Sequence, residues 1–488
     1  MMHRLPLQIR PDPTRVLVRP FVPAAEPRAL NPTDAPRALK ILTRILSLGD
    51  DEVHRLLDEV MRDFENRHSD IRRIFLDHFE RVREYLPTDR PLSEERRLLI
   101  GAYFTNEYSL ECVAVFNPSI VPHPDQSGVD SDSVRIILSL RATGEGHISS
   151  ITFRSGIVHG NGGIEIDPPS RFVAEPRPIP SAEYDRETFT RKLAELGLDN
   201  AFARHVLDTL GDRFTLAQLR SAVDVQRRYH KHPDTDGIGA RMVLLARSNY
   251  EVEFDPSQSI SERIIFPFSP SQSNGIEDAR FVCFRDDDGS VTYVATYTAY
   301  DGRIVLPQLL ETRDFLRFRV CTLNGPAVQN KGMALFPRRI GGHYCMLSRQ
   351  DNENIHVMFS DHLHFWFESR VILRPTEPWE FVQLGNCGSP IETEAGWLVL
   401  THGVGPMRKY CIGAILLDLE DPTRVIGRLR EPLLKPAPDE REGYVPNVVY
   451  TCGAMVHRGR LMVPYAISDT ATTFATASLD DILSAMTK

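Results

Sequence analysis

The sequence Asn274-Gly275-Ile276-Glu277-Asp278-Ala279-Arg280-Phe281-Val282 carries two adjacent carboxylates and an arginine at the start of an apolar run. The run continues to Phe284 without alternation, which is typical of a strand buried on both faces. Glu277, Asp278 and Arg280 are therefore expected at its entrance, where burial and neighbouring charge separate carboxyl pKa values. Two interpretations follow: an acid–base site with one protonated carboxyl, or a structural salt bridge between Arg280 and either acid.

The composition is that of a folded protein with a large core. The chain has 488 residues, 42% of them hydrophobic and 25% charged, and its net charge is −9. This length exceeds that of one ordinary domain. The sequence contains no long basic stripe, so nucleic acid is not an expected partner.

No segment of the sequence predicts secretion or membrane spanning. Residues 1–20 carry arginines throughout and no apolar signal-peptide core, and no apolar run is long enough to cross a bilayer. The seven cysteines include no Cys-x-x-Cys pair, and most lie in apolar, strand-like runs. We therefore expect buried free thiols and a cytoplasmic protein with no membrane partner.

The N-terminal region is predicted to be helical after an extended tail. Residues 1–36 are rich in proline and arginine and lack periodicity, which indicates the tail. Apolar residues at helical spacing then predict a helical module over residues 37–110, in which Ser93 is an N-cap. Its apolar faces must be covered, so we expect the module to mediate assembly, such as a homo-oligomer, or to wall a binding channel.

Strands are predicted over residues 111–180 and 236–488, where short apolar or alternating runs are separated by turn residues. Residues 181–235 predict a helical insertion between them. In the insertion, Gly197 and Gly211 are placed just after helix C-termini, and Thr215-x-x-Gln218 has the pattern of a capping box. The predicted fold is therefore mainly β with two helical additions.

A weak repeat runs through the second strand region. A glycine turn, an apolar strand and a polar residue at the strand end recur at intervals of roughly fifty to sixty residues, beginning at Gly289, Gly342, Gly396 and Gly459. This pattern indicates the blades of a β-propeller, whose strand ends converge on one mouth of the central channel. The polar residues expected to converge there are Asn117, Arg141, Glu277, Asp278, Arg280, Tyr300, Asp301, Arg303, Lys331, Arg349, His402 and Asp469.

Two ligand chemistries suit this set of residues. Acidic, amide and tyrosine side chains suit the hydroxyl groups of a sugar, whereas converging Arg, Lys and His suit a phosphate or carboxylate. The polar loop from Arg141 to Ser150 is predicted to contribute to binding. The structural alternative is that the individual charges form salt bridges between blades.

Several short segments carry a further signal: Asn274 to Val282, Tyr297 to Gly302, Lys331-Gly332, Ala334 to Pro337, Met346 to Arg349, Gly388 to Ile391, Gly396 to Leu398, His402 to Val404 and Leu416 to Pro422. In this order they resemble glycoside hydrolase family 130, which contains β-mannoside phosphorylases and some β-mannosidases. The resemblance covers residues 111–180 and 236–488. It implies a five-bladed β-propeller, with the N-terminal helical module and the helical insertion outside the family core.

The resemblance also implies roles for individual residues. The family's Gly-x-Glu-Asp-Pro-Arg motif places its general acid on Asp278, and Ala279 replaces the usual proline, which changes loop stiffness more than chemistry. Where the family often has His-Arg-Pro, this chain has Ser348-Arg349-Gln350. The predicted substrate-binding residues are Asn117, Arg141, Ser150, Glu277, Arg280, Tyr300, Asp301 and Asp469, and the residues that match the family's phosphate-binding cluster are Arg303, Lys331, Arg349 and His402.

The predicted function is inverting phosphorolysis of β-1,2- or β-1,4-linked manno-oligosaccharides. The product is α-mannose 1-phosphate, and inorganic phosphate is a co-substrate, without a cofactor. Two alternatives remain open. The first is an inverting β-mannoside hydrolase that uses Glu353, Glu368 or Glu392 as a second carboxylate, and the other is a sugar-binding propeller without catalysis.

Two further motifs are interpreted structurally. Asp286-Asp287-Asp288-Gly289 is predicted to be a hairpin turn, because no Glu follows at the spacing of a calcium loop. His362 and His364 are placed on one strand face, without a third ligand nearby in the sequence. We therefore expect no metal.

Overall fold

The computed structural model describes residues 2–21, 23, 37–179, 183–229, 233–302 and 305–487. The chain divides into two compact units. The smaller unit contains residues 12–112 and 170–174, and the larger contains residues 1–11, 113–169 and 175–488.

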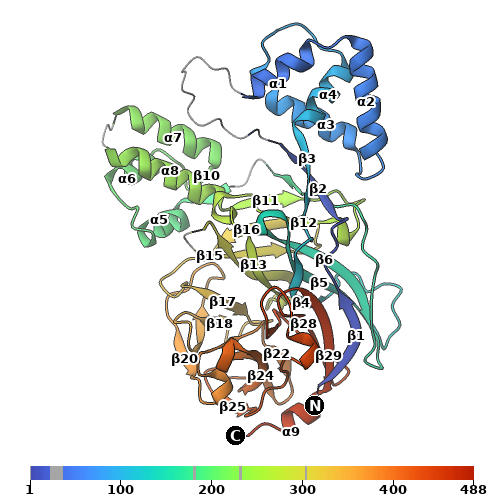
Figure 1. Cartoon of the computed structure of the whole chain (residues 1–488). Coiled ribbons are helices and arrows are strands. Elements are labelled where there is room, and N and C mark those ends of the chain that lie inside the picture. Colours follow the sequence, from blue (N-terminus) through green and yellow to red (C-terminus); the bar gives the residue numbers. More distant parts are fainter. Residues whose placement is uncertain are drawn as a thin grey trace. The chain divides into compact units, whose positions relative to one another are not determined.

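The smaller unit is a helical cluster with one two-stranded sheet. Its elements are β2 (Val16–Pro20), α1 (Arg37–Leu46), α2 (Asp50–Phe64), α3 (Ile71–Val82), α4 (Glu94–Tyr103) and β3 (Thr105–Ser109) (Figure 1). Leu42, Val53, Phe79 and Leu99 pack together in its core, as their helical spacing predicts. Ser93 accepts a hydrogen bond from Arg96 N at 3.2 Å, which confirms it as the N-cap of α4.

Within the described residues, the larger unit contains five antiparallel sheets of at least four strands. The first contains β4 (Ala114–Pro122), β5 (Val134–Thr143), β6 (Ser149–Val158), β7 (Ile164–Ile166) and β12 (Ile264–Ile265). The second contains β8 (Arg177–Pro178), β11 (Tyr250–Glu253), β13 (Ile276–Arg285), β14 (Val291–Tyr300), β15 (Val305–Thr312) and β16 (Arg317–Thr322). The protein is therefore mainly β, as predicted.

The remaining three large sheets follow in chain order, except for one N-terminal strand. The third contains β17 (Lys331–Leu335), β18 (Tyr344–Arg349), β19 (Ile355–Ser360) and β20 (Arg370–Leu373). The fourth contains β21 (Gln383–Asn386), β22 (Ile391–Thr393), β23 (Gly396–Val404), β24 (Tyr410–Leu417) and β25 (Val425–Arg428). The fifth contains β1 (His3–Ile9), β26 (Val449–Tyr450), β27 (Met455–His457), β28 (Arg460–Ile467) and β29 (Ala471–Ser478), and α9 (Leu479–Ser484) follows it.

Two strands lie within residues 1–20, where the sequence predicted an extended tail. β1 pairs with β29 in the fifth sheet, and β2 pairs with β3. Both partners lie far along the chain, so local composition does not reveal the pairing. The rest of the predicted tail, residues 22 and 24–36, lies outside the described residues.

Hydrogen bonds join the large sheets at, or next to, one edge strand of each sheet. These bonds run from Phe281 N to Ser119 Oγ (3.0 Å), from Asn386 Nδ2 to Gly332 O (2.8 Å), from Cys452 N to Pro118 O (2.8 Å) and from Arg280 Nε to Cys387 O (2.7 Å). Thr296 on β14 also donates to the carbonyl oxygen of Met333 on β17. The edge strands β4, β13, β17, β21 and β26 are therefore held close to one another.

Three of these edge strands, β4, β13 and β17, carry a β-bulge. The ladder register shifts between Phe116 and Ser119, between Glu277 and Arg280, and between Lys331 and Ala334. A residue with positive φ lies inside each shift: Asn117 (48°), Asp278 (54°) and Gly332 (87°). Asn and Asp are among the few side chains that adopt this backbone region, and a bulge redirects the side chain it carries. The bulges therefore aim Asn117 and Asp278 out of their ladders.

The helical insertion forms its own small core inside the larger unit. It contains β9 (Glu183–Asp185), α5 (Arg186–Glu195), α6 (Ala201–Asp208), β10 (Arg213–Thr215), α7 (Leu216–Tyr229) and α8 (Pro233–Arg247), drawn in green in Figure 1. Phe189, Val206, Leu219 and Met242 pack in this core. The capping box is confirmed, because Gln218 Oε1 accepts from Thr215 N at 2.8 Å.

The predicted end of the insertion is wrong. Strands were expected from residue 236, but α8 continues to Arg247. Pro233 lies at the first position of α8, where the missing N–H costs nothing because that group has no partner inside a helix. A residue interpreted as the end of the helical region therefore begins another helix.

The cysteines and the helix lengths bear on two further expectations. All seven cysteines lie in the described part of the chain and are free, and Cys112 is exposed while Cys283 is half-buried. The prediction of free thiols is confirmed. No helix among the described residues is both long enough and apolar enough to cross a membrane.

The link between the first two sheets predicts a stability difference between two buried serines. Ser119→Ala removes the acceptor of Phe281 N, so we expect the free energy of unfolding in urea to fall by about 1–3 kcal/mol. Ser139 lies opposite Ser119 in the β4–β5 ladder and is also buried, but its Oγ has no hydrogen-bond partner within the described residues. Ser139→Ala is therefore the matched control and should cost little. Equal losses in the two variants would contradict the proposed importance of this link.

Candidate active site

Glu277 and Asp278 lie in one network of charges at the bulge of β13. Asn117 Nδ2 donates to Asp278 Oδ1 at 2.7 Å, and Arg141 Nη1 lies 3.4 Å from the same oxygen. Arg141 Nη2 lies 3.1 Å from Glu277 Oε1, and Lys331 Nζ lies 2.7 Å from Glu277 Oε2. Arg141 therefore bridges both carboxylates, and strands β4, β5, β13 and β17 all contribute to the network.

Arg280 fixes the backbone of this bulge from below the surface. Its side chain is 3% exposed, and Nη1 donates to the carbonyl oxygen of Asp278 at 3.0 Å. Nε donates to Cys387 O at 2.7 Å, and Nη2 donates to the Tyr450 hydroxyl at 2.7 Å. The guanidinium is thus occupied by protein groups, so its geometry is that of a residue that positions Asp278. Sequence reasoning missed Tyr450, because β26 is only two residues long and shows no pattern.

Lys331, which contacts Glu277, also lies beside a second basic side chain, that of Arg349. Lys331 and Arg349 are opposite each other in the β17–β18 ladder, and Arg349 Nη1 lies 2.8 Å from His402 Nε2. Gly385 packs against this pair, since a Cβ at its position would lie 2.5 Å from His402 Cε1 and 2.8 Å from Arg349 Cδ. Burial and the charges of Arg349 and Arg280 lower the pKa of His402 well below its usual value. His402 is therefore neutral and accepts a hydrogen bond from Arg349.

The two aspartates near Arg141 differ in protonation. Burial alone would raise the pKa of Asp278, but the charges of Arg141 and Arg280 and the hydrogen bond from Asn117 outweigh it, so this pKa lies below its usual value. Burial and the charge of Asp278 raise the pKa of Asp469 to about 7, against the opposing charges of Arg141 and Arg408. Asp278 is thus ionised at neutral pH, whereas Asp469 keeps its proton to a much higher pH than an ordinary aspartate.

Exposure separates the residues that a ligand can reach from those that hold them. The side chains of Arg141, Glu277, Asp278 and Lys331 are 20%, 17%, 19% and 34% exposed. Those of Arg280 and His402 are 3% and 2% exposed. The first group is available to a bound molecule, whereas Arg280 and His402 act through Asp278 and Arg349.

Other predicted site residues lie nearby or outside the described chain. Tyr300 and Asp301 lie at the end of β14, where the Asn274 N donates to Tyr300 O at 2.9 Å. Ser150 is 1% exposed on β6, which leaves little surface for a ligand. Arg303 lies outside the described residues.

The three glutamates considered as bases for hydrolysis are exposed. Glu392 forms an ion pair with Arg338 at 2.8 Å. Asp278, Glu277 and Asp469 are the carboxyl groups whose charges act on Arg141. Glu353, Glu368 and Glu392 are not among them.

The two motifs interpreted structurally have different outcomes. Asp286 and Gly289 form the predicted hairpin turn between β13 and β14, in which Gly289 N donates to Asp286 O at 2.9 Å. The expectation that His362 and His364 share a strand face is wrong, because both lie in a turn after β19.

Comparisons with known proteins assign the second strand region to a family. A family model described as beta-1,4-mannooligosaccharide phosphorylase matches residues 240–488. A 1,2-beta-oligomannan phosphorylase of Thermoanaerobacter sp. (strain X514) is 39% identical over 216 residues, which are 43% of this chain and 70% of the relative. A beta-1,2-mannobiose phosphorylase of Listeria innocua serovar 6a is 34% identical over 227 residues, which are 45% of this chain and 62% of the relative.

One more relative and one solved structure also match this chain. A beta-1,4-mannooligosaccharide phosphorylase of Ruminococcus albus is 33% identical over 215 residues, covering 41% of this chain and 62% of the relative. The chain thus spans between 62% and 70% of the length of these three relatives. A solved structure of a beta-1,2-mannobiose phosphorylase from Listeria innocua superposes with a TM-score of 0.47 at 22% identity, covering 78% of this chain and 92% of that one.

The raised pKa of Asp469 predicts a pH-dependent stability. The folded state holds a proton on Asp469 up to about pH 7, whereas an unfolded aspartate loses it near about pH 4. Stability is therefore lost as pH rises through this window. Because Asn cannot ionise, the melting temperature of Asp469→Asn relative to wild type should increase between about pH 5 and about pH 8. Asp63→Asn, at an exposed position of α2, is the control. A difference that does not change with pH would rule out this assignment.

Proposed function

We propose that this chain, which belongs to glycoside hydrolase family 130, is an inverting phosphorylase of β-1,2- or β-1,4-linked manno-oligosaccharides. The observation that carries this proposal is the charge balance of the site. Four cationic side chains, Arg141, Arg280, Lys331 and Arg349, accompany the carboxylates of Glu277 and Asp278 and the carboxyl of Asp469, whose pKa is raised to about 7. Such an excess of positive charge favours an anionic co-substrate beside the acid.

The proposed architecture of the larger unit is a five-bladed β-propeller. Hydrogen bonds at or next to edge strands link the first sheet to the second, the third to the fourth, and the fifth to the first. Thr296 links the second sheet to the third, and Gly388 packs so closely against Cys452 that a Cβ would lie 2.3 Å from its carbonyl oxygen. Neighbour contacts of this kind are what a ring of blades requires, and they support a common mouth for the site.

In the proposed reaction, phosphate held by Lys331 and Arg349 attacks the anomeric carbon of the terminal mannose. The carbon–oxygen bond to the next sugar breaks as the bond to a phosphate oxygen forms, and the proton of a carboxyl group passes to the leaving oxygen. One displacement inverts the configuration, so the products are α-mannose 1-phosphate and a chain one mannose shorter. Glu277, Arg141 and Asn117 hold the reacting groups in place, and Tyr300 and Asp301 are proposed substrate contacts.

The proton donor in this proposal is Asp278, although its pKa is lowered without a ligand. The charges of Arg141, Arg280 and Lys331 contribute to that lowering, and Arg141 and Lys331 are exposed enough to contact a bound phosphate. A phosphate beside them would offset their charge and raise the pKa of Asp278, while Arg280 keeps its contacts with protein groups. Asp469, with a pKa of about 7, can supply the proton. Phosphate binding would thereby prepare the acid for the reaction.

Hydrolysis is the second candidate, and the two aspartates are the observation that favours it. Their pKa values are shifted in opposite directions, which is the pattern of an acid and base pair. In an inverting hydrolase, Asp469 would protonate the leaving oxygen and Asp278 would activate water. The identity of the acid thus differs between the two reactions.

Turnover with and without phosphate tests both candidates. Purified protein should cleave β-1,2- or β-1,4-mannobiose only when phosphate is present, and one product should be α-mannose 1-phosphate. Asp278→Asn should lower kcat on the disaccharide by about 10²–10⁴-fold, the usual size of general acid catalysis. The loss should be much smaller on a nitrophenyl β-mannoside, whose leaving group needs little protonation.

Two results would favour hydrolysis: mannose release that does not depend on phosphate, and a kcat loss in Asp469→Asn that is large on the disaccharide and small on the nitrophenyl β-mannoside. Binding of the sugars without turnover would favour a binding protein.

The basic pair can be tested by separate KM values. Lys331→Ala and Arg349→Ala should raise the KM for phosphate, while the KM for the mannoside changes little. The fall in kcat/KM should correspond to a loss of about 2–4 kcal/mol in transition-state stabilisation. Arg338→Ala is a matched control, because Arg338 forms an exposed ion pair with Glu392 outside this group. A lower melting temperature with equal effects on both substrates would assign Lys331 and Arg349 to the scaffold instead.

We also propose a homo-oligomer formed through the helical regions, a role of those regions beside the substrate, and a cytoplasmic location. The free state of all seven cysteines supports a reducing compartment.

A further inference from the structure

Three side chains with metal-binding atoms meet away from the candidate active site. Glu311 lies on β15, Cys321 on β16 and His364 in the turn after β19. Their carboxylate, thiol and imidazole atoms all lie within 4.8 Å of one another. His364 Nε2 lies 2.7 Å from Glu311 Oε1. Nothing in the reaction proposed above uses this cluster.

The fold itself brings the three residues together. Glu311 pairs with Arg319 in the β15–β16 ladder, and Cys321 follows Arg319 by two residues, so Glu311 and Cys321 share one face of the second sheet. His364 comes from the third sheet's connection. Its carbonyl oxygen accepts from Asn324 N at 2.9 Å and from Asn324 Nδ2 at 3.1 Å. The turn that carries His364 is therefore fastened to the end of β16.

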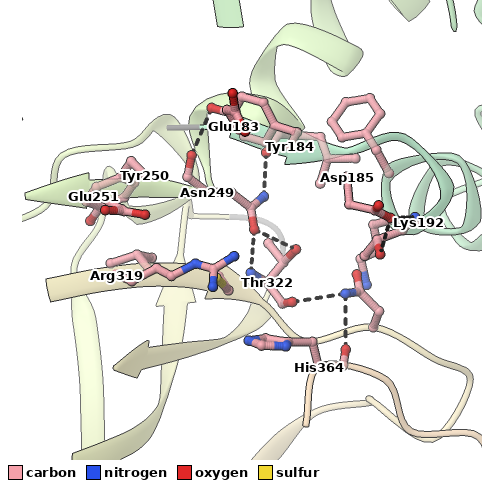
Figure 2. Close-up of a pocket in the computed structure, with 16 residues that line it drawn as sticks. Glu183, Tyr184, Asp185, Lys192, Asn249, Tyr250, Glu251, Arg319, Thr322 and His364 are labelled. Atoms are coloured by element: carbon pink, nitrogen blue, oxygen red, sulfur yellow. Dashed lines mark hydrogen bonds between the residues drawn. The ribbon is translucent and has the colours of Figure 1, made fainter. Parts of the chain in front are cut away.

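A cavity of about 160 Å³ opens beside the cluster, between the second sheet and the helical insertion. Cys321, His364 and Arg319 line it together with Tyr184 and Asn249. Figure 2 shows His364 and Arg319 on the side opposite the insertion residues Tyr184 and Asp185. The cluster thus borders a space that holds water-sized molecules.

We propose that Glu311, Cys321 and His364 bind one divalent transition-metal ion of the zinc class, with a water from the cavity as the fourth ligand. Zinc takes thiolate, imidazole and carboxylate ligands, whereas calcium and magnesium take oxygen ligands. A carboxylate and a thiolate together balance a divalent charge. Arg319 lines the same cavity, where its guanidinium can donate to the thiolate and orient it.

The three ligand atoms lie within 4.8 Å of one another, so a tetrahedral ion requires their side chains to adjust. Ligand atoms about 2.0–2.3 Å from zinc lie roughly 3.3–3.6 Å apart in a tetrahedron. The present 2.7 Å between His364 Nε2 and Glu311 Oε1 is a hydrogen bond that would open by roughly half an ångström. The simpler alternative is that His364 and Glu311 form only an ion pair and Cys321 is an unreactive core thiol.

Such an ion would have a structural consequence. Glu311 and Cys321 belong to the second sheet, whereas His364 belongs to the connection between β19 and β20 of the third. One ion would therefore fasten two neighbouring sheets together. Because the unfolded chain lacks the assembled site, binding should stabilise the folded state.

Cobalt(II) titration of the full-length protein tests the proposal. Wild type should bind one equivalent and develop the near-ultraviolet thiolate-to-cobalt absorption and the visible bands of tetrahedral cobalt. Cys321→Ser should abolish the thiolate band, and His364→Gln and Glu311→Gln should each weaken binding at least tenfold. Cys112→Ser and His362→Gln are matched controls, because both positions are exposed and lie outside the cluster.

Thermal melts provide an independent measurement. Zinc should raise the melting temperature of wild type and of Cys112→Ser, but not that of Cys321→Ser. Absence of the cobalt bands in wild type would overturn the proposal whatever the variants do. A thiolate band that survives in Cys321→Ser but disappears in Cys112→Ser would also overturn it.

Discussion

The buried guanidinium of Arg280 is the group on which the site depends. It donates to backbone oxygens of Asp278 and Cys387 and to the hydroxyl of Tyr450, so it joins the second, fourth and fifth sheets. A buried cation with three hydrogen bonds is costly to disrupt, because each acceptor would be left without a partner. The same guanidinium lies 3.9 Å from Asp278 Oδ2, where its charge lowers the pKa of that carboxyl. Sheet assembly and the protonation of the proposed acid therefore share one residue.

The bulge at Asp278 shows why such a support is needed. Asn117 and Asp278 both have positive φ, a conformation that costs energy for a residue with a side chain. Side-chain hydrogen bonds hold these conformations. Asn117 donates to Asp278 Oδ1, and Arg280 donates to Asp278 O. The strain is thus local to the two residues that face each other, and it is balanced by contacts between sheets.

The sequence predicted the acidic motif and missed much of its surroundings. Asp278, Glu277 and Arg280 were identifiable because they are adjacent and precede an apolar strand, and Lys331 and Arg349 because each lies at a strand end. Tyr450 and Asn386 were not, since their contacts join sheets that are distant in the sequence. β1 and α8 were missed for related reasons: one pairs with the far end of the chain, and the other begins at a proline. His402 was identified as a ligand, but only its burial reveals that it supports Arg349.

Burial divides the basic residues of the site into two functions that composition alone cannot separate. Arg141 and Lys331 are partly exposed and contact carboxylates through charge, so a bound anion can compete for them. Arg280 contacts backbone oxygens that cannot leave, so its charge stays in place whatever binds. When an anion binds, it offsets the charges of Arg141 and Lys331, whereas the charge of Arg280 still acts on Asp278. The pKa of Asp278 should therefore rise only as far as those two offset charges allow, because Arg280 still favours the ionised form. A second carboxyl with a higher pKa is then useful, and Asp469 lies within the same field to provide it.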